Sequence, residues 1–507
     1  MLQSTASSPL LLTPAPGGRL GGRIRVARGL PRFHEDLSAR RNSVLGCPEL
    51  AVPADDPARM IRKFIDEKDF SAQERGHSAL GRKPAHPRFK LGAWLYGSLV
   101  GVHEASKLAK MTRDSQAMRL VCGGRTMCAE TLKSFRRENV ELFEECMAWT
   151  VAESVRLNLV DPQTLAADSM RVRADASTKS IRTLERSKKR LVELAKVDSA
   201  TLDPAAREIH EEKVAKHATA VERCEEEGRT SHSLTDPGAA LMKFPSGASA
   251  PGHRLTTMAA GVFARLIIWL MIDSSANDFG HLEQACMESR AALIKAGIPV
   301  RVGAPPMQVA ADPGYLSDPD LKFAEAHREQ IDVLIHLPDA PVRTNDEGEK
   351  LFGRSAFTIG ADDTAKCPAG KLMHGPLKLD AQRRQWRGIG CAECPLKAEC
   401  TKGKSRTLTQ NVEHDRLYAA MATRMAEPGA RERYGRRMCT VEPPYSYIED
   451  VIGFRRSTSR DPRTVRAEIL LKVIAYNLTR IAKCASLRVL RLEVDVCDAP
   501  GRVLAWA

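Results

Sequence analysis

The chain has 507 residues, a length that exceeds one ordinary domain and predicts about three folded units. Its 77 Lys and Arg residues outnumber 63 Asp and Glu residues, and the net charge of +14 favours a polyanionic partner, nucleic acid before membrane. No apolar run is long enough to span a bilayer, which excludes a membrane-embedded class. The 13 cysteines come without a convincing secretory signal, and this favours a reducing compartment with metal-bound or free thiols over a disulfide framework.

Residues 1–48 are predicted to form a flexible basic leader. They mix Ser, Pro, Gly and Arg with few acids, a composition that buries little apolar surface. A transit peptide, a disordered arm that touches DNA, or a start codon placed too far upstream would give a similar composition. The composition alone does not separate these alternatives.

The segment 49–160 is predicted to be an all-helical domain, because apolar residues such as Ile61 and Ile65 recur at the spacing of one helical face. Arginines are frequent in its second half, where a phosphate-binding surface is predicted with Arg136 and Arg137 as candidates. A helical bundle that only supports the rest of the chain is the alternative.

From residue 161 to 485 the pattern predicts a core of strands and helices. The stretch LAADSMRVRADAS carries Asp168. Asp175 is the nearest competing acid, but an offset of seven residues places it on the opposite face of a regular strand. At most one of these two acids can therefore serve a site on that strand.

Residues 178–228 interrupt this core and are predicted to form an antiparallel helical hairpin. Apolar residues recur at helical spacing on both sides of a break at Asp203 and Pro204, within a densely charged surface. An inserted structural arm is the simpler interpretation, and dimerisation or clamping of DNA is the alternative.

The sheet is predicted to resume with strands over 253–260 and 265–272, followed by a helix over 277–296 for which SSAND offers N-cap oxygens. A buried strand then delivers Asp312 at its carboxyl end, and another strand follows at 331–337. Sites in open sheets with helices lie at the carboxyl ends of strands. Asp312 is therefore a candidate site residue, with capping of the next helix as the alternative.

A cysteine cluster lies within residues 338–405. Cys391 and Cys394 form a CxxC pair, and Cys367 and Cys400 flank it, a pattern that fits tetrahedral thiolate coordination of Zn²⁺. Four protein ligands leave no open position, so the metal would be structural. Few apolar residues lie between the ligands, which predicts that the module folds only with its metal. Four reduced, unliganded thiols are the alternative.

The stretch 434–456, YGRRMCTVEPPYSYIEDVIGFRR, sets Glu442 among arginines. Glu442 is predicted to lie at the start of a short helix, because Pro443 and Pro444 lack N–H groups that a first turn does not need. An acid among cations suggests a place where metal ions and phosphates meet, and a solvated helix with ordinary charge pairs is the alternative. Glu449, seven residues later, is the competing acid.

A further helix is predicted to pack against the sheet before a C-terminal tail over 486–507. The residues that share its predicted buried face are Val465, Ile469, Val473, Asn477 and Ile481.

The stretches around Asp168, Asp312 and Glu442, in this order, resemble the catalytic core of the DDE transposases of bacterial insertion sequences. The patterns ADPGY and YGRR–VEP–GFRR carry much of this resemblance, which extends over residues 50–485. It implies an α+β or α/β fold with a ribonuclease-H-like mixed sheet and flanking helices. An all-α N-terminal domain precedes that core in the family, and a similar Cys-rich insert occurs there. The predicted architecture thus includes the helical hairpin and the small zinc-binding insertion.

The resemblance implies that Asp168, Asp312 and Glu442 are catalytic and hold two Mg²⁺ or Mn²⁺ ions. Two such ions about 4 Å apart activate an attacking water or 3′-hydroxyl and stabilise the leaving oxygen. Carboxylates suit them because hard divalent cations take oxygen ligands. The arginines predicted to bind DNA are Arg136, Arg137, Arg433, Arg436, Arg437, Arg455 and Arg456.

The function implied is metal-dependent DNA cleavage and strand transfer, the transposition of an insertion sequence. The expected partners are the element's ends and target DNA, with a homo-oligomer on DNA, no membrane, and a cytoplasmic, nucleoid-associated location. A catalytically inactive, zinc-containing DNA-binding protein derived from such an enzyme is the alternative function. A metal-dependent nuclease without strand transfer would share the same site.

Overall fold

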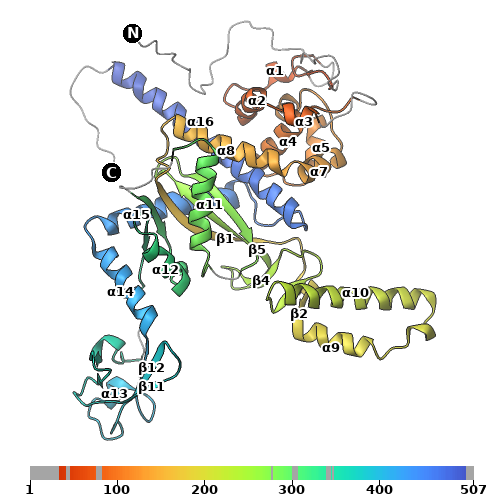
Figure 1. Ribbon diagram of the computed structural model, residues 1–507. Coiled ribbons are helices and arrows are strands. Elements are labelled where there is room, and N and C mark those ends of the chain that lie inside the picture. The colour runs from red at the N-terminus through yellow and green to blue at the C-terminus, as the bar shows by residue number, and fades with distance from the viewer. Residues whose placement is uncertain are drawn as a thin grey trace. The chain divides into compact units, whose positions relative to one another are not determined.

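The computed structural model describes residues 33–41, 46–75, 83–275, 278–299, 306–338, 344 and 348–497, with side chains described as far as residue 486. The chain divides into two compact units, and Figure 1 labels the helices and strands. The first comprises Met1–Asn277, Ala285–Arg301 and Arg436–Ala507, and the second comprises Asp278–Gln284 and Val302–Gly435. Among the described helices, none has both the length and the apolar character that crossing a membrane requires.

The N-terminal part of the first unit is helical, as predicted. Its helices are α1 (Pro48–Ala51), α2 (Pro57–Glu67), α3 (Ser71–Arg75), α4 (Pro87–Leu99), α5 (Ala105–Asp114), α6 (Gln116–Val121), α7 (Ala129–Glu138) and α8 (Val140–Arg156). Asp56 caps α2 by accepting a hydrogen bond from the Ala58 N–H, and Pro57 occupies the first helical position, where its missing N–H has no consequence. Helix α4 is buried on nearly all sides, and Trp94 in it donates to the Leu132 carbonyl at 3.0 Å.

The sheet of the first unit is antiparallel. It contains β1 (Thr164–Arg173), β4 (Ala240–Lys243), β5 (Ser249–Ala260) and β6 (Leu266–Asp273). Strand β5 pairs with β1 along one edge and with β4 and β6 along the other. The register places Asp168 of β1 opposite Thr257 of β5. Strands β5 and β6 are both buried over most of their length, and for β6 this agrees with its near-continuous apolar run.

Helix α16 (Pro462–Cys497) packs against this sheet. The predicted face is confirmed: Val465, Ile469, Val473, Asn477 and Ile481 are all buried. The Asn477 amide accepts from the Ile267 N–H at 3.1 Å and donates to the Ile267 carbonyl at 2.8 Å, which joins the helix to β6. The helix continues beyond residue 485, where the tail was predicted to begin.

The predicted pair of helices within 178–228 is present as α9 (Leu184–Leu194) and α10 (Pro204–Glu226), which pack on each other (Figure 1). Asp203 caps α10 through the Ala206 N–H at 2.9 Å, and Pro204 is the first helical residue. Two short strands, β2 (Ile181–Thr183) and β3 (Ser231–Ser233), pair at the base of the hairpin.

The second unit contains a parallel pair of strands, β7 (Met307–Ala311) and β8 (Ile331–Ile335). Its helices include α12 (Asp318–Ala326) and α14 (Val412–Ala426). The chain therefore combines parallel and antiparallel strand pairs, so an α+β fold with mixed strand pairing and a helical N-terminal region is confirmed.

The helix predicted from residue 277 is α11 (Leu282–Lys295), which begins several residues later. Asn277 lies outside the described residues. The N–H groups of Gly280 and Leu282 donate to Asp320 at 2.7 and 3.0 Å. A carboxylate from a segment far along the chain therefore helps to cap α11, which the local SSAND pattern does not indicate.

The cysteine-rich part of the second unit is a small β-module. Its elements are β9 (Thr358–Ile359), β10 (Ala365–Lys366), β11 (His374–Lys378), β12 (Arg383–Arg387), α13 (Lys397–Cys400) and β13 (Thr407–Asn411). Phe357, Ala365, Met373, Trp386 and Leu408 form a small buried core. Sequence analysis underestimated this core, since Met373 and Trp386 lie between the cysteines in sequence and are buried among these residues.

Candidate functional site

Strand β1 holds Asp168 in the middle of the sheet, where its neighbours fix the carboxylate. One carboxylate oxygen accepts the Ser169 N–H at 2.8 Å, and the other lies 3.0 Å from Nη2 of Arg437. The Asp168 side chain is 16% exposed, so it is sheltered but still open to an incoming ligand. Burial of this carboxylate is tolerable because a cation and a backbone donor accompany it.

Glu442 lies inside helix α15 (Ala430–Ser446), and the prediction that a helix begins at this residue was wrong. Pro443 and Pro444 are within the helix, although each proline removes a backbone donor there and disfavours the helix by about 3 kcal/mol. Tertiary packing favours the continuous helix: Val441 is fully buried against Ala166 and Ala259. That packing is invisible in the local sequence pattern.

Arg437 joins the two acids. Its Nη1 lies 4.0 Å from Oε1 of Glu442, while its Nη2 contacts Asp168 and its Nε donates to the Ala167 carbonyl at 3.3 Å. The guanidinium is 7% exposed, whereas the Glu442 side chain is 52% exposed. The first unit thus brings two carboxylates from distant segments to one cation, and one of those carboxylates faces solvent.

Tyr445 is a functional candidate that sequence analysis missed. Its hydroxyl donates to the Asp168 carbonyl at 2.7 Å and makes a hydrogen bond of 2.8 Å with Oγ1 of Thr257. These bonds fix the backbone of β1 at Asp168. The signal in the sequence was the position of Tyr445, three residues after Glu442 and hence on a neighbouring part of the same helix.

The competing acids lie in different surroundings. Asp175 follows the end of β1, and its carboxylate pairs with Arg456 at 3.3 Å and with Arg460 at 2.9 Å. Glu449 is in the π-helical turn Tyr447–Val451, where burial raises its pKa and Asp450 adds to that effect.

Asp312 belongs to the second unit, directly after β7. Its Oδ1 accepts the Gly314 N–H at 2.7 Å, so it caps the 3-10 turn Pro313–Tyr315. A Cβ added to Gly314 would lie 2.8 Å from Oδ1 of Asp312 and 2.9 Å from Oδ2 of Asp278. Two carboxylates therefore flank one glycine. The sequence pattern makes Asp278 a candidate helix cap, and its proximity to Asp312 is not encoded in that local pattern.

Two of the arginines predicted to bind DNA are buried. Arg437 is the residue between the acids. Arg136 donates to Ser459 at 2.9 Å, lies 3.5 Å from Glu468, and stacks 4.5 Å above the Trp94 ring. Burial lowers the Arg136 pKa. This side chain helps to hold the helical region against the segment before α16.

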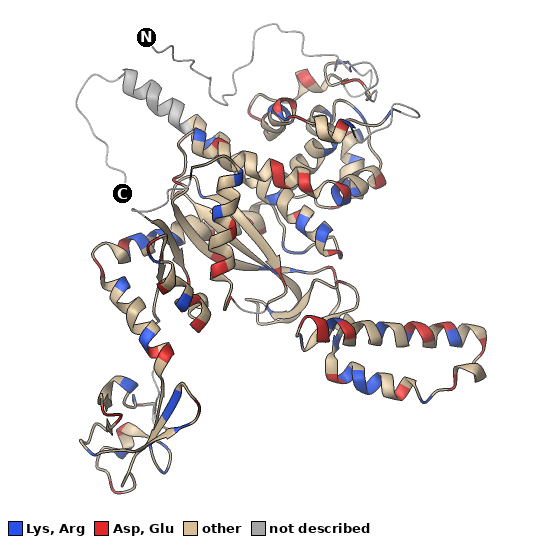
Figure 2. Ribbon diagram, in the orientation of Figure 1, with Lys and Arg blue, Asp and Glu red and all other residues tan. Residues whose placement is uncertain are grey.

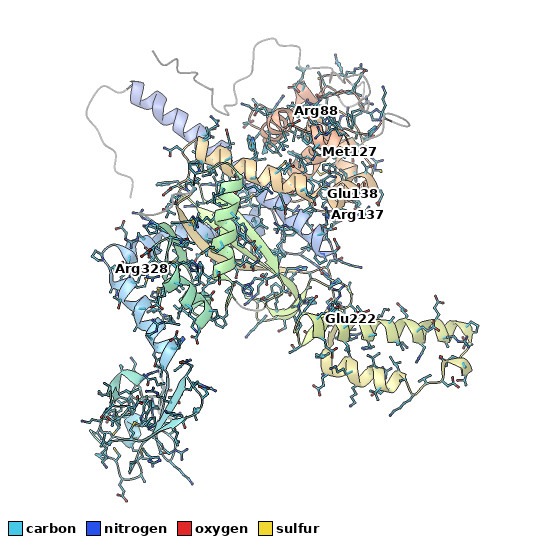
Figure 3. All side chains as sticks on the ribbon, in the orientation of Figure 1. Arg88, Met127, Arg137, Glu138, Glu222 and Arg328 are labelled. Carbon is cyan, nitrogen blue, oxygen red and sulfur yellow. The ribbon has the colours of Figure 1, made fainter. Side chains whose placement is uncertain are left out.

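The remaining arginines are more accessible. Arg137 is exposed at the end of α7, beside Glu138 (Figure 3). Arg436 is exposed on α15, and Arg455 pairs with Asp450 at 2.6 Å. Arg456 is 57% exposed while it pairs with Asp175. Arg433, in the second unit, lies 4.0 Å from Asp332.

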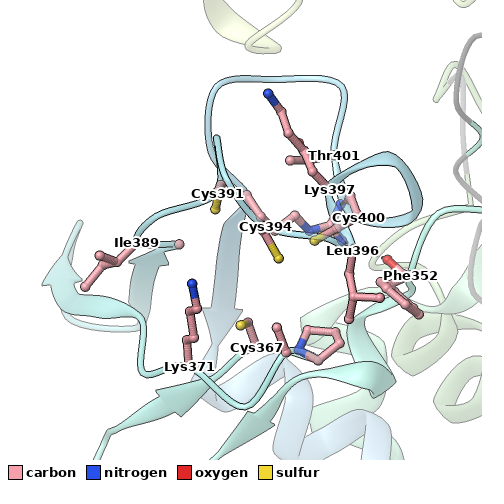
Figure 4. Close-up of a pocket in the computed structure, with 14 residues that line it drawn as sticks. Phe352, Cys367, Lys371, Ile389, Cys391, Cys394, Leu396, Lys397, Cys400 and Thr401 are labelled. Carbon is pink, nitrogen blue, oxygen red and sulfur yellow. Dashed lines mark hydrogen bonds between the residues drawn. The ribbon is translucent and has the colours of Figure 1, made fainter.

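The four predicted zinc ligands line one small cavity of about 20 Å³ (Figure 4). Cys367 follows β10, Cys391 and Cys394 lie in the loop before α13, and Cys400 ends that helix. Burial raises the pKa of the Cys400 thiol, and the other three thiols add to this effect because neighbouring thiolates would repel its charge. A cavity of this size suits a single atom or ion.

In the part of the chain that the structure describes, no three or more His, Cys, Asp and Glu side chains converge closely enough to hold a metal ion. The four thiols line a common space without closing on one point. At the other site, the guanidinium of Arg437 occupies the position between Asp168 and Glu442. Both donor sets nevertheless match their expected ions: thiolates for Zn²⁺, and carboxylates for Mg²⁺.

Comparison with protein-family models gives two matches. Residues 366–482 match the family described as "Transposase DDE domain", and residues 47–138 match "Transposase domain (DUF772)". The first match includes all four clustered cysteines, Arg437 and Glu442, whereas Asp168 and Asp312 lie outside both matches. Comparisons with curated proteins and with solved structures found no match.

Proposed function

We propose that this chain, which is a DDE transposase of the insertion-sequence type, cuts DNA at the ends of its own element and joins them to target DNA. The observation that carries the proposal is the convergence of Asp168 and Glu442 on Arg437. A strand and a helix far apart in sequence present two carboxylates to one cation, an arrangement that a solvated charge pair does not require.

In this proposal Asp168, Asp312 and Glu442 hold two Mg²⁺ or Mn²⁺ ions within a ribonuclease-H-like core. Such ions act as Lewis acids on both sides of an in-line displacement at phosphorus. Carboxylate oxygens such as those of Asp168 and Glu442 are suitable ligands for these ions. The two side chains already flank one positive charge, the guanidinium of Arg437. Asp278, beside Asp312, is a further oxygen donor in the second unit.

The protein's own residues supply position and charge balance. Ser169 and Arg437 orient the Asp168 carboxylate, while Tyr445 and Thr257 fix the strand that carries it. Arg437 neutralises the repulsion between two approaching carboxylates, which lets them remain close before DNA arrives. Pre-organisation of this kind lowers the cost of placing the reacting groups.

The four clustered cysteines are proposed to bind a structural Zn²⁺. The support is that thiols from three separate positions line one cavity in a module whose own apolar core is small. Loading would require the thiols to release their protons and close on a single point. The metal would stabilise the module and take no part in the chemistry, because four protein ligands fill its coordination shell.

The test compares the wild-type protein with the variant Asp312→Asn on one labelled element end. This substitution keeps the size of the side chain and removes its negative charge. We expect the wild-type protein to cut with Mg²⁺ and the variant not to, while both bind the end with similar salt dependence, because DNA binding rests on Lys and Arg contacts to phosphate. Asp175→Asn is the matched control and should still cut. Wild-type protein that binds ends but never cuts with Mg²⁺ or Mn²⁺ would contradict the proposal, and so would cleavage by Asp312→Asn.

A further inference from the structure

The base of the helical hairpin is closed by its own contacts and packs against strands β4 and β5 of the sheet. The β2–β3 pair closes its base, where the Leu184 N–H also donates to the Thr230 carbonyl at 3.0 Å. The hydroxyl groups of Ser180 and Ser233 make a further hydrogen bond at 3.2 Å. The hairpin follows β1, the strand that carries Asp168, by only a few residues. The hairpin is therefore connected through a short segment of chain to the strand that carries Asp168.

The two helices of the hairpin carry opposite charge (Figure 2). In α9, the cations Arg186, Lys188, Lys189 and Arg190 outnumber the acids Glu185 and Glu193. In α10, the acids Glu208, Glu211, Glu212, Glu222, Glu225 and Glu226 outnumber the cations Arg207, Lys213, Lys216 and Arg223. Figure 3 shows Glu222 on α10. Such segregation gives the hairpin one basic side and one acidic side.

Some of the cations on α9 form no ion pair with the described acids. Lys188 pairs with Glu225 of α10 at 2.6 Å, which ties the helices together. Arg186 and Lys189 are exposed, and neither forms an ion pair with any acid among the described residues. They are three residues apart, so they share one side of the helix. Lys196, just beyond the end of α9, is also exposed and without an ion pair in the described part of the chain.

We propose that the basic side of α9, through Arg186, Lys189 and Lys196, binds the phosphate backbone of DNA at the element end. This inference rests on the proposed function. From Arg186 to Lys196 the chain spans about 15 Å at helical rise, and phosphates along one strand advance about 3.4 Å each, so the three cations can reach separate phosphates. The net negative charge of α10 disfavours its approach to DNA, so α9 is the side of the hairpin that we expect to face it.

The test measures the affinity of a labelled duplex of the element end over a range of salt concentrations. The variant replaces Arg186, Lys189 and Lys196 with Gln, and the control replaces Lys213, Lys216 and Arg223 of α10 with Gln, which removes the same charge from the acidic helix. If each of the three α9 cations neutralises one phosphate, the slope of log K against log salt should become shallower by about 2 to 3 in the variant. The control should keep the wild-type slope. Circular dichroism checks that both variants remain helical.

An unchanged slope in the α9 variant would overturn the inference and leave the proposed function intact. Wild-type protein that binds no DNA would overturn both. The α9 surface could instead contact α10 of a second copy of the chain. Light scattering without DNA tests this alternative by measuring the oligomeric state. Dissociation of an oligomer in the α9 variant, with no change in the salt slope, would assign the surface to that contact and contradict DNA binding.

Discussion

The Asp168–Glu442 region and the cysteine cluster are positioned in different ways. Asp168 lies on a strand of a buried sheet, and Glu442 lies on a helix that packs Val441 into the same core. The cysteines belong to a module with a five-residue buried core and line a cavity without closing on it. The comparison teaches that a large core can place charged groups before any ligand arrives, whereas the small module, in our proposal, needs its metal to complete its site.

The first unit holds other charged groups in its interior, which supports this contrast. Glu468 is fully buried and accepts hydrogen bonds from Ser457 and Thr458, with Arg136 at 3.5 Å. Lys472 is 1% exposed and donates to Ser98 Oγ at 3.0 Å. Buried charge is tolerated only where partners surround it; Glu468 has such partners, whereas burial lowers the pKa of Lys472.

The largest expected effect is at the cysteine cluster. Cys391→Ser should abolish zinc binding and make residues 348–411 sensitive to proteolysis, because structural zinc contributes about 10 kcal/mol to the folding of small zinc modules. Zinc content by mass spectrometry and limited proteolysis measure the two effects. Cys439→Ser, which changes an exposed thiol on α15, should alter neither. Wild-type protein that contains no zinc when purified without chelator would show that the module is complete without a metal.

The second effect concerns the cation between the acids. Arg437→Met should lower the free energy of unfolding by about 3 kcal/mol, because it leaves the sheltered Asp168 carboxylate without its cation. Chemical denaturation at neutral pH measures this change. Arg436→Met, at the neighbouring exposed position, should stay within about 0.5 kcal/mol of the wild-type value. Equal stability of the two variants would mean that the core does not hold the acids through Arg437.

The smallest effect is a pH dependence from Lys472, whose pKa burial lowers to about 7. The folded protein then releases this proton near neutral pH, while the unfolded chain keeps it until about pH 10, so the free energy of unfolding should rise with pH between these values. Lys472→Met should flatten that rise and stabilise the protein by about 1 to 2 kcal/mol at neutral pH. Denaturation midpoints measured across this pH range test it, with the exposed Lys483→Met as control. A rise as steep in Lys472→Met as in the wild type would assign the effect to other groups.

Patterns that depend on local periodicity were predictable from sequence. Hydrophobic spacing and capping chemistry predict the α16 face, the break at Asp203 and Pro204, and the buried strand β6, and the structure confirms them. These features need no knowledge of distant residues.

Features that depend on distant partners were missed. The helix at Glu442 runs through Pro443 and Pro444 because Val441 packs into the sheet, and a local pattern favours a helix start there. Likewise, Arg437 was predicted as a DNA contact because it stands in a run of arginines, but it lies buried beside Asp168. Burial and long-range pairing are properties of the fold, which a charge run in the sequence does not encode.

The most direct test of the central claim is metal rescue at Asp168. Asp168→Cys replaces a hard oxygen ligand with a soft thiolate, which Mg²⁺ binds poorly and first-row transition ions such as Mn²⁺ and Co²⁺ bind better. Cleavage of a labelled element end should be lost with Mg²⁺ and partly restored with Mn²⁺ or Co²⁺, while Asp175→Cys cuts with each metal. Activity of Asp168→Cys that is the same with all three ions, whether fully retained or fully lost, would contradict the account that Asp168 holds a catalytic metal.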